Sequence, residues 1–202
     1  VKTATVTVTS DYSSLVDKSP AVLPTSRIQF SCAENSSTHK IYCFGGNTNS
    51  GYTNQIIQYD PANNTVTTQT ATLPTGRVGH SCAENSSTHK IYCFGGSDAS
   101  GRLDKIIQYD PANNTVTTQS ATLPTGRSSF SCAENSSTHK IYCFGGLDDD
   151  ASYNNQIVEY NSTTNAITLK SAVMPSNFAD QYGHSCAENS STHKIYCFVR
   201  SY

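Results

Sequence analysis

Apolar and polar positions along this chain fall into short alternating runs. In residues 31–46, SCAENSSTHKIYCFGG, two short β-prone runs flank a polar centre. Runs of this length separated by a tight polar turn are typical of two antiparallel strands. We therefore expect a hairpin in which the segment before Glu34 pairs with Lys40–Phe44. Helical periodicity of 3.6 residues appears nowhere in the sequence.

The same sixteen residues recur letter for letter at 81–96 and 131–146. A fourth copy begins at Ser185 and keeps fourteen of them before ending in Val199 and Arg200. The copies are spaced by fifty residues, and by fifty-four before the last one. A fixed period of this size indicates a repeat architecture whose units bury their faces against one another. We therefore expect a single domain over residues 1–202.

A second pair of strands follows each hairpin after a variable loop. In the first unit these strands are residues 55–59 (QIIQY) and 65–69 (TVTTQ). The turn between them, residues 60–64, contains Pro61, which presets φ, and Asx residues that cap the turn. Each unit is thus predicted to hold four short antiparallel strands, named a, b, c and d. The fold class is all-β.

The eight cysteines share one spacing. Folding the hairpin about Ser37 and Thr38 places Cys32 opposite Cys43, at about 4.5–5.5 Å between Cβ atoms, near the spacing of a disulfide. We predict four disulfides and hence an oxidising compartment, with the protein secreted, extracellular or on the cell surface. Buried free thiols and a zinc site are the alternatives, although an eleven-residue step is not a zinc knuckle. The predicted pairs are Cys32–Cys43, Cys82–Cys93, Cys132–Cys143 and Cys186–Cys197.

Three motifs in the second unit resemble the kelch repeat of β-propellers. They are the segment from Arg77 through His80 and Ser81, the pair Gly95 and Gly96, and the turn at Tyr109, Asp110 and Pro111. The resemblance covers essentially the whole chain and implies a propeller. The chain departs from the kelch pattern in having fewer units than is usual and in lacking the strand-d tryptophan. Its replacements are Val66, Val116 and Ile167, while Phe30 and Phe130 stand where His80 and His184 occur in the other units.

The two ends of the chain carry complementary halves of a unit. Aligning Val6 with Ile56 makes residues 5–22 strands c and d, whereas residues 181–198 supply only a and b. We predict a four-bladed kelch-like propeller, with blades at 23–72, 73–122, 123–173, and 174–202 plus 1–22. The N-terminal strands c and d would close the last blade on the C-terminal strands a and b, which removes exposed sheet edges. Pairing of half-blades between molecules, growing into a filament, is the alternative.

Asn-x-Ser/Thr sequons occur in the a–b and c–d turns, all on one predicted face of the disc. N-linked glycosylation requires this tripeptide in an exposed loop of a secreted protein, and we predict it here, although some sequons arise by chance in so Asn- and Ser-rich a chain. The sites are Asn35, Asn63, Asn85, Asn113, Asn135, Asn161 and Asn189.

The b–c loops, residues 47–54, 97–104 and 147–155, share almost no sequence, and the neighbouring d–a loops vary as well. These loops lie on the predicted face opposite the sequons. Varied loops on a constant frame are typical of a recognition surface, and drift in tolerant loops is the alternative. The candidate binding residues are Tyr52, Arg102, Tyr153, Phe178 and Tyr182.

The low charge of the chain limits the kinds of partner that we expect. Charged residues make up 14 % of the chain and the net charge is −2, so we expect neither nucleic acid nor an anionic membrane as a partner. No apolar run approaches the ~20 residues of a membrane span. No signal peptide is present, and we expect Val1 to be a mature or trimmed start.

Candidate chemistry is sparse. The turn histidines His39, His89, His139 and His193 are expected to be solvent-exposed rather than a metal ring. Residues 148–150 (DDD) are expected to be a solvated loop rather than a calcium site. The recurring Arg27, Arg77 and Arg127 are expected to bond to neighbouring blades, and His80 and His184 to pack beside the channel. Copper chemistry of the galactose oxidase type needs a thioether-linked cysteine, whereas all cysteines here are assigned to hairpins. We predict no enzyme activity, no cofactor and no metal.

The favoured hypothesis is a secreted, glycosylated, non-enzymatic module that binds a protein or glycan through its b–c and d–a loops. A structural or surface protein that assembles into stacks or filaments is the alternative, favoured by the near-identity of the units. An engineered consensus array is a third hypothesis, disfavoured by irregular insertions at residues 148–153 and 178–181.

Overall fold

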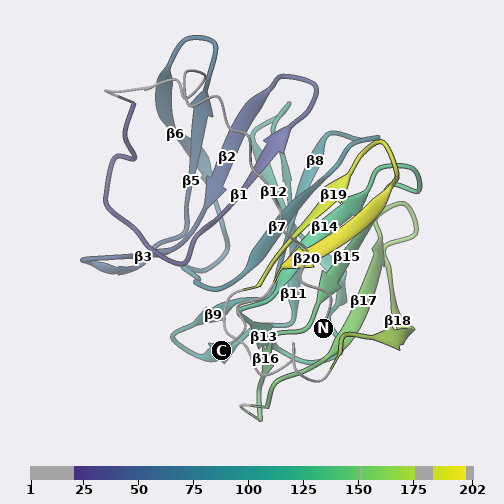
Figure 1. Ribbon diagram of the computed structural model, residues 1–202. Coiled ribbons are helices and arrows are strands. Elements are labelled where there is room, and N and C mark those ends of the chain that lie inside the picture. The colour runs from purple at the N-terminus through teal and green to yellow at the C-terminus, as the bar shows by residue number, and fades with distance from the viewer. Residues whose placement is uncertain (1–20, 151, 176–183, 199–202) are drawn as a thin grey trace.

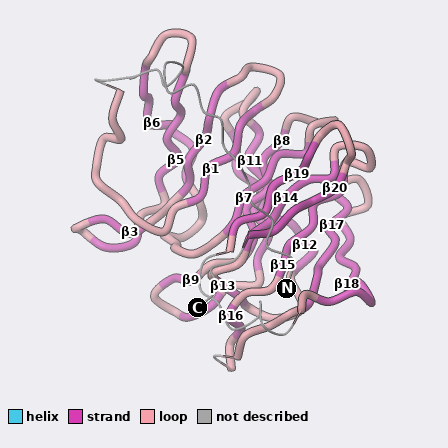
Figure 2. Tube along the Cα trace, in the orientation of Figure 1, coloured by secondary structure: helices cyan, strands magenta, loops and turns pink. Residues whose placement is uncertain are grey.

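The computed structural model describes residues 21–150, 152–175 and 184–198. Strands and loops account for all of these residues, so the predicted all-β class is confirmed (Figure 2). No helix suited to crossing a membrane occurs within the described ranges.

Three complete antiparallel sheets have the predicted four strands. The first runs in the order β1-β2-β5-β6, the second β7-β8-β11-β12, and the third β14-β15-β17-β18. A two-stranded sheet, β19-β20, follows. The bounds of the first sheet are β1 (Ser31–Asn35), β2 (Lys40–Phe44), β5 (Gln55–Asp60) and β6 (Thr65–Thr72). Those of the second are β7 (Ser81–Asn85), β8 (Lys90–Phe94), β11 (Lys105–Asp110) and β12 (Thr115–Thr122). Those of the third and fourth are β14 (Ser131–Asn135), β15 (Lys140–Phe144), β17 (Gln156–Asn161), β18 (Ala166–Val173), β19 (Ser185–Asn189) and β20 (Lys194–Phe198).

The strands a of successive units lie side by side. β1 contacts β7, β7 contacts β14, and β14 contacts β19, so the sheets fan out from a shared inner row as blades (Figure 1). The predicted N-terminal strands within residues 5–22 lie almost entirely outside the described residues. Closure of the last blade and the number of blades therefore stay predictions.

The predicted hairpin register is confirmed. Cys32 pairs with Cys43, and Glu34 pairs with Ile41, in the β1–β2 ladder. The equivalent cysteines are opposed in the other three hairpins, and the four bonded pairs have Cα–Cα distances of 4.0 to 4.1 Å. All eight cysteines are described and none is free, so the structure has neither the free thiols nor the zinc thiolates of the alternatives. Four disulfides suit an oxidising, extracellular environment.

The core lies between the sheets, because alternating residues of a strand point to opposite sheet faces. Tyr42 and Phe44 of the first sheet pack on Ile91, Ile107 and Tyr109 of the second. The Tyr109 ring lies 5.3 Å from that of Tyr42 and 5.7 Å from that of Phe44. The next boundary repeats this contact, with the Tyr160 ring packed on Tyr92 and Phe94. Each sheet thus has a leading face that receives the previous unit and a trailing face that covers the next one.

The b–c loops and one d–a loop contain short strands that the sequence did not predict. Two-residue ladders are too short to show alternation, so only backbone pairing reveals them. They are the hairpins β3 (Asn47–Thr48)–β4 (Gly51–Tyr52) and β9 (Ser97–Asp98)–β10 (Gly101–Arg102), and the pair β13 (Arg127–Ser128)–β16 (Leu147–Asp148).

Candidate recognition face

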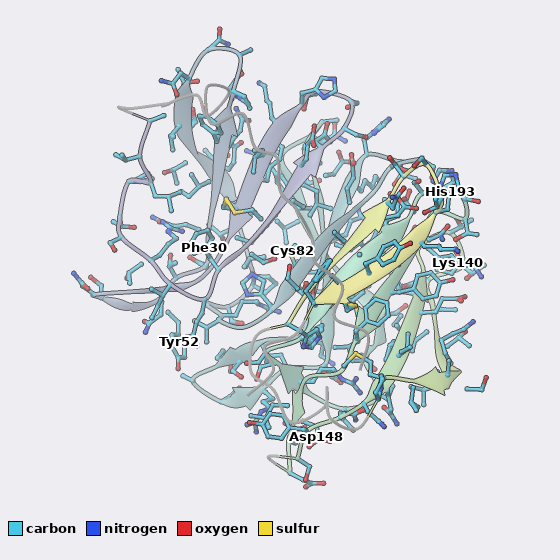
Figure 3. All side chains as sticks on the ribbon, viewed as in Figure 1. Phe30, Tyr52, Cys82, Lys140, Asp148 and His193 are labelled. Atoms are coloured by element: carbon cyan, nitrogen blue, oxygen red, sulfur yellow. A yellow bond between two sulfur atoms is a disulfide. The ribbon has the colours of Figure 1, made fainter. Side chains whose placement is uncertain are left out.

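The molecule has two contrasting edges. Figure 3 shows Tyr52 and Asp148 at one of them and His193 and Lys140 at the other. The first, the loop edge, consists of the described parts of the b–c loops (residues 47–54, 97–104, 147–150 and 152–155) with the adjoining described d–a loops. The second, the turn edge, consists of the a–b turns (residues 36–39, 86–89, 136–139 and 190–193). The loop edge contains a groove, whereas the side chains of the turn edge bond one unit to the next.

A groove of about 540 Å³ lies on the loop edge between the first and second units. Its walls are the β3–β4 hairpin, the d–a loop and the tip of the β9–β10 hairpin. The residues that line it are Tyr52, Thr75, Gly76, Asp98, Ala99 and Ser100.

The groove presents a ring and a carboxylate. Tyr52 is 48 % exposed. The Oδ1 atom of Asp98 accepts hydrogen bonds from the Ser100 backbone N–H at 2.8 Å and from its hydroxyl at 2.5 Å. These bonds, together with the Arg77 charge, lower the pKa of Asp98 below its usual value. The groove therefore offers a fixed negative charge beside an aromatic surface.

Arg77 is buried next to the groove residues Thr75 and Asp98. Its side chain is buried and donates to the Gly95 carbonyl at 3.1 Å and to the Thr75 hydroxyl at 3.3 Å. Burial lowers the pKa of Arg77, and the charge of Asp98 opposes that effect. The expectation that this side chain bonds to a neighbouring blade is wrong, because its partners belong to its own unit. Its backbone carbonyl makes the cross-unit bond instead, accepting from the Gly46 N–H at 2.8 Å.

The other predicted binding residues do not converge on the groove. Arg102, on β10, is the counterpart of Tyr52 at the next inter-unit boundary, where Asp149 approaches Gly126. Tyr153 forms an isolated bridge with Leu147 further along the same edge. Phe178 and Tyr182 lie outside the described residues. Of the three candidates that the structure describes, Tyr52 alone lines this groove.

Sequence reasoning missed Thr75, Gly76 and Asp98 as groove residues. Thr75 and Gly76 belong to a Leu-Pro-Thr-Gly-Arg segment shared with the next unit, so nothing in their pattern marked them as variable. Asp98 differs from the equivalent Thr48, and that difference was the available signal.

At the turn edge the repeated residues bond one unit to the next. The Asn35 amide donates to the His89 carbonyl at 2.8 Å, and the Ser36 N–H donates to the Glu84 carboxylate at 2.8 Å. The Ser36 hydroxyl also lies 3.2 Å from Nδ1 of His89. The same bonds recur at the following two boundaries. The turn histidines are therefore structural connectors as well as surface residues.

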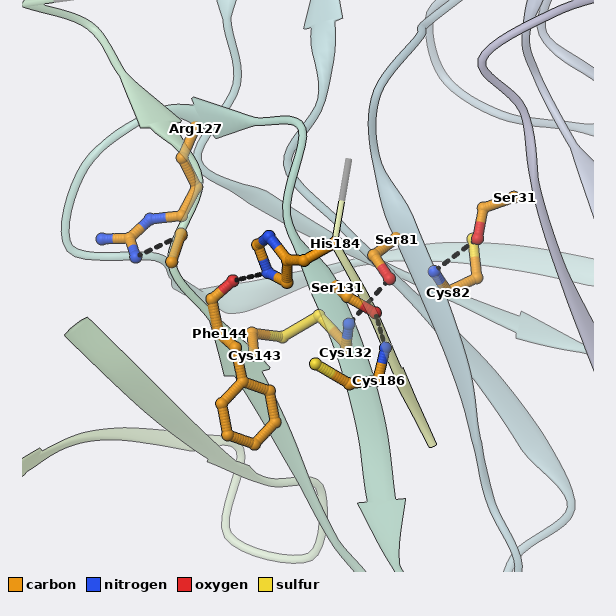
Figure 4. The surroundings of a disulfide bond; sticks show 11 residues. Ser31, Ser81, Cys82, Arg127, Ser131, Cys132, Cys143, Phe144, His184 and Cys186 are labelled. Carbon is orange, nitrogen blue, oxygen red and sulfur yellow. Dashed lines mark hydrogen bonds between the residues drawn. A yellow bond between two sulfur atoms is a disulfide. The ribbon is translucent and has the colours of Figure 1, made fainter. Parts of the chain in front are cut away.

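Serine hydroxyls add a second ladder across the inner strands. Ser31, Ser81 and Ser131 each accept the backbone N–H of the cysteine one unit on, at 2.9 Å (Figure 4). The serine of strand a, the asparagine and the first serine of the turn thus each bond to the next unit. Ser37 and Thr38 bond instead to Asn35 of their own hairpin.

This bonding contradicts the expectation that all seven sequons lie in exposed turns. Asn35 is 2 % exposed and Asn85 is 1 % exposed, because both side chains reach the next unit. Asn135 and Asn161 are half-buried. Asn63, Asn113 and Asn189 are exposed, as predicted.

His80 is buried beside the Cys82–Cys93 disulfide, and neither ring nitrogen has a hydrogen-bond partner among the described residues. Burial and the Arg77 charge lower the pKa of His80 to about 3. The nearby Phe44 carbonyl, whose geometry falls short of a hydrogen bond, opposes this only partly. Both cysteine sulfurs are bonded to each other, so the three residues do not form a thiolate metal site. His184, the counterpart in the fourth unit, lies 2.7 Å from the Phe144 carbonyl (Figure 4).

The sequence matches the family described as KLHDC2/KLHL20/DRC7 Kelch-repeats domain over residues 6–135. No curated protein matches the chain. Among solved structures, 179 chains match. One of them, the structure of YjhT, has a TM-score of 0.65 and 16 % sequence identity over 81 % of this chain. The match spans 57 % of the YjhT chain, so this chain corresponds to little more than half of it.

Proposed function

The chain belongs to the kelch-repeat family of β-propellers, and from this premise we propose that it is a non-enzymatic module that binds a protein segment at its loop edge. A kelch propeller supports protein binding in general. The groove that contains Tyr52 and Asp98 is the observation that carries the assignment to this edge.

The chemistry of the groove suggests what kind of segment it takes. Tyr52 offers an apolar ring with a polar tip, a combination enriched at protein interfaces. Asp98 offers an anionic acceptor that favours a Lys or Arg side chain. We therefore propose a peptide segment with a basic residue next to an apolar one. A glycan could use the same ring and carboxylate, so the experiment includes it.

A comparison with the turn edge supports the assignment of binding to the loop edge. Its side chains are occupied by bonds between units, so altering one of them would cost stability. The side chains of Tyr52 and of Asp98 can change without breaking a bond between units. An edge that tolerates change can acquire specificity, whereas the other cannot.

The proposed compartment is extracellular, on the strength of the four disulfides. We propose that N-glycans are carried by Asn63 and Asn113 and not by Asn35 or Asn85. Expression through a secretory pathway followed by glycopeptide mapping tests this. Glycan at Asn35 or Asn85 in folded protein would refute it, because the amide nitrogen that carries the sugar is the one bonded to the next unit.

Binding is tested by selecting a displayed random peptide library on the 202-residue chain, with a glycan array probed in parallel. We expect enriched peptides to carry a basic residue, and Tyr52→Ala and Asp98→Asn each to weaken binding at least tenfold. Leu169→Ala is the matched control, because Leu169 is also 48 % exposed but lies on β18, away from the groove. Selected ligands that bind all three variants equally would refute the groove, and glycan binding alone would replace peptide with sugar.

A further inference from the structure

The bonds between units are directional. In each contact one unit gives donors from its a–b turn, and the next unit supplies a glutamate carboxylate and a histidine carbonyl. The apolar contacts have the same direction, since a trailing face always covers a leading face. The two ends of a row of units must therefore be different and complementary.

The leading end of the first unit has an open receiving face. The Glu34 and His39 side chains are 57 % and 82 % exposed, whereas Glu84 in the second unit is 12 % exposed. A groove of about 350 Å³ lies on the same face. Its lining is apolar and consists of Ala21, Leu23, Phe30, Ile41, Cys43, Tyr59 and Val66.

In the second unit the equivalent residues are covered. Ile91, Cys93 and Tyr109 are each 0–1 % exposed beneath Tyr42 and Phe44 of the first unit. The structure itself therefore shows which side chains fit this groove.

The trailing end of the fourth unit presents those side chains. Tyr196 and Phe198 are 48 % and 69 % exposed, whereas their counterparts Tyr42 and Phe44 are 3 % and 0 % exposed. Asn189, the counterpart of the amide donor Asn35, is exposed too. A tyrosine, a phenylalanine and an amide donor are thus arranged as at every internal boundary, with no described unit to receive them.

The two ends do not meet within the described part of one chain. β19 packs against β14 (Figure 1), and no comparable contact joins β19 to β1.

We propose that a second copy of this chain occupies the leading end, with its trailing face of Tyr196, Phe198 and Asn189 seated on the first unit's groove, Glu34 and His39. The contact is heterologous, so each copy keeps one free end of each kind, and association continues until the ring closes or a filament forms. The contact between copies repeats the apolar contacts and hydrogen bonds found between neighbouring units of one chain. The binding free energy comes from burial of the two exposed aromatic rings and of the apolar groove.

The test is sedimentation velocity and native mass on the 202-residue chain across a wide concentration range. We expect species larger than the monomer whose fraction rises with concentration. Glu34→Lys blocks the leading end and Phe198→Asp blocks the trailing end, and each should weaken association at least tenfold. Both positions are exposed, so neither change disturbs a buried contact. Leu169→Asp, an exposed apolar position on β18, is the control and should associate like the unmodified chain.

Mixing the two blocked variants gives the sharpest result. Each has one intact end, and the intact ends are complementary, so the mixture should form a one-to-one dimer and nothing larger. A monomer at every concentration would overturn the proposal in favour of closure within one chain. A mixture that stays monomeric, or blocked variants that associate like the unmodified chain, would overturn it as well. None of these outcomes depends on the peptide groove, which retains all six of its lining residues in every variant.

Discussion

Replacing the buried His80 with phenylalanine should remove an acid-sensitive element of the fold. Folding keeps the imidazole neutral, because its pKa falls from 6.5 to about 3 in the folded protein. Between these values the unfolded chain binds a proton that the folded chain excludes, so stability is full above pH 6.5 and falls as the pH drops towards 3. The slope approaches about 1.4 kcal/mol per pH unit, for a total of about 5 kcal/mol over the whole range.

The substitution itself should be tolerated. Phe130 occupies the equivalent position in the third unit and is 6 % exposed there, with its Cβ 2.9 Å from a Cβ built on Gly146. A Cβ built on Gly96 would likewise lie 2.8 Å from the Cβ of His80, so the two side chains occupy equivalent places. Removing two ring nitrogens that have no described partner should stabilise the protein at pH 7 by about 1 kcal/mol.

Urea unfolding followed by circular dichroism at pH 4 to 7 measures the effect. The gap in unfolding free energy between His80→Phe and the unmodified chain should widen by about 3 kcal/mol from pH 7 to pH 4. Phe130→His is the reciprocal variant and should gain the same acid sensitivity. A gap that stays constant with pH would show that the site is hydrated or that the imidazole is protonated in the folded state, and it would refute the argument.

Three further predictions concern the scaffold. Replacing Cys132 and Cys143 together with alanine should lower the unfolding free energy by about 2–3 kcal/mol, because the unfolded chain regains the freedom of a short loop; urea unfolding without reductant measures this, and no loss would mean that the bond is absent in solution. Gly95→Ala and Gly101→Ala should both destabilise, because φ is +53° and +131° at these positions. Gly95→Ala should cost more, since its Cβ would also lie 2.5 Å from the Arg127 carbonyl oxygen whereas one at Gly101 would meet nothing within 4 Å; equal changes in melting temperature would contradict it. Ser81→Ala should cost about 1–3 kcal/mol by leaving a buried N–H unpaired, which hydrogen exchange at Cys132 reports as faster opening.

The units and their internal form follow from local patterns in the amino-acid sequence. Alternating residues and tight polar turns specify strands locally, so the four-strand unit and the Cys32–Cys43 register could be derived from letters alone. The repeat then required neighbouring units, because one such sheet cannot bury both of its faces. Family membership followed from motifs that recur at fixed spacing.

The partners and the burial of the repeated residues depend on the tertiary structure. Asn35 carries a sequon and lies in a turn, yet the next unit buries it. Arg77 was expected to bond across units and instead bonds within its own. Both outcomes depend on the distance between one hairpin and the next, and that distance is set by the packing of Tyr42, Phe44 and Tyr109.

The groove likewise could not be predicted from the sequence. Tyr52 and Asp98 are forty-six residues apart and belong to different units, and they face one groove only because the β3–β4 and β9–β10 hairpins are held side by side. Local patterns encode a strand and its turn within a few residues. Which loops of two units approach each other is decided by packing between whole sheets, so only the tertiary structure could reveal it.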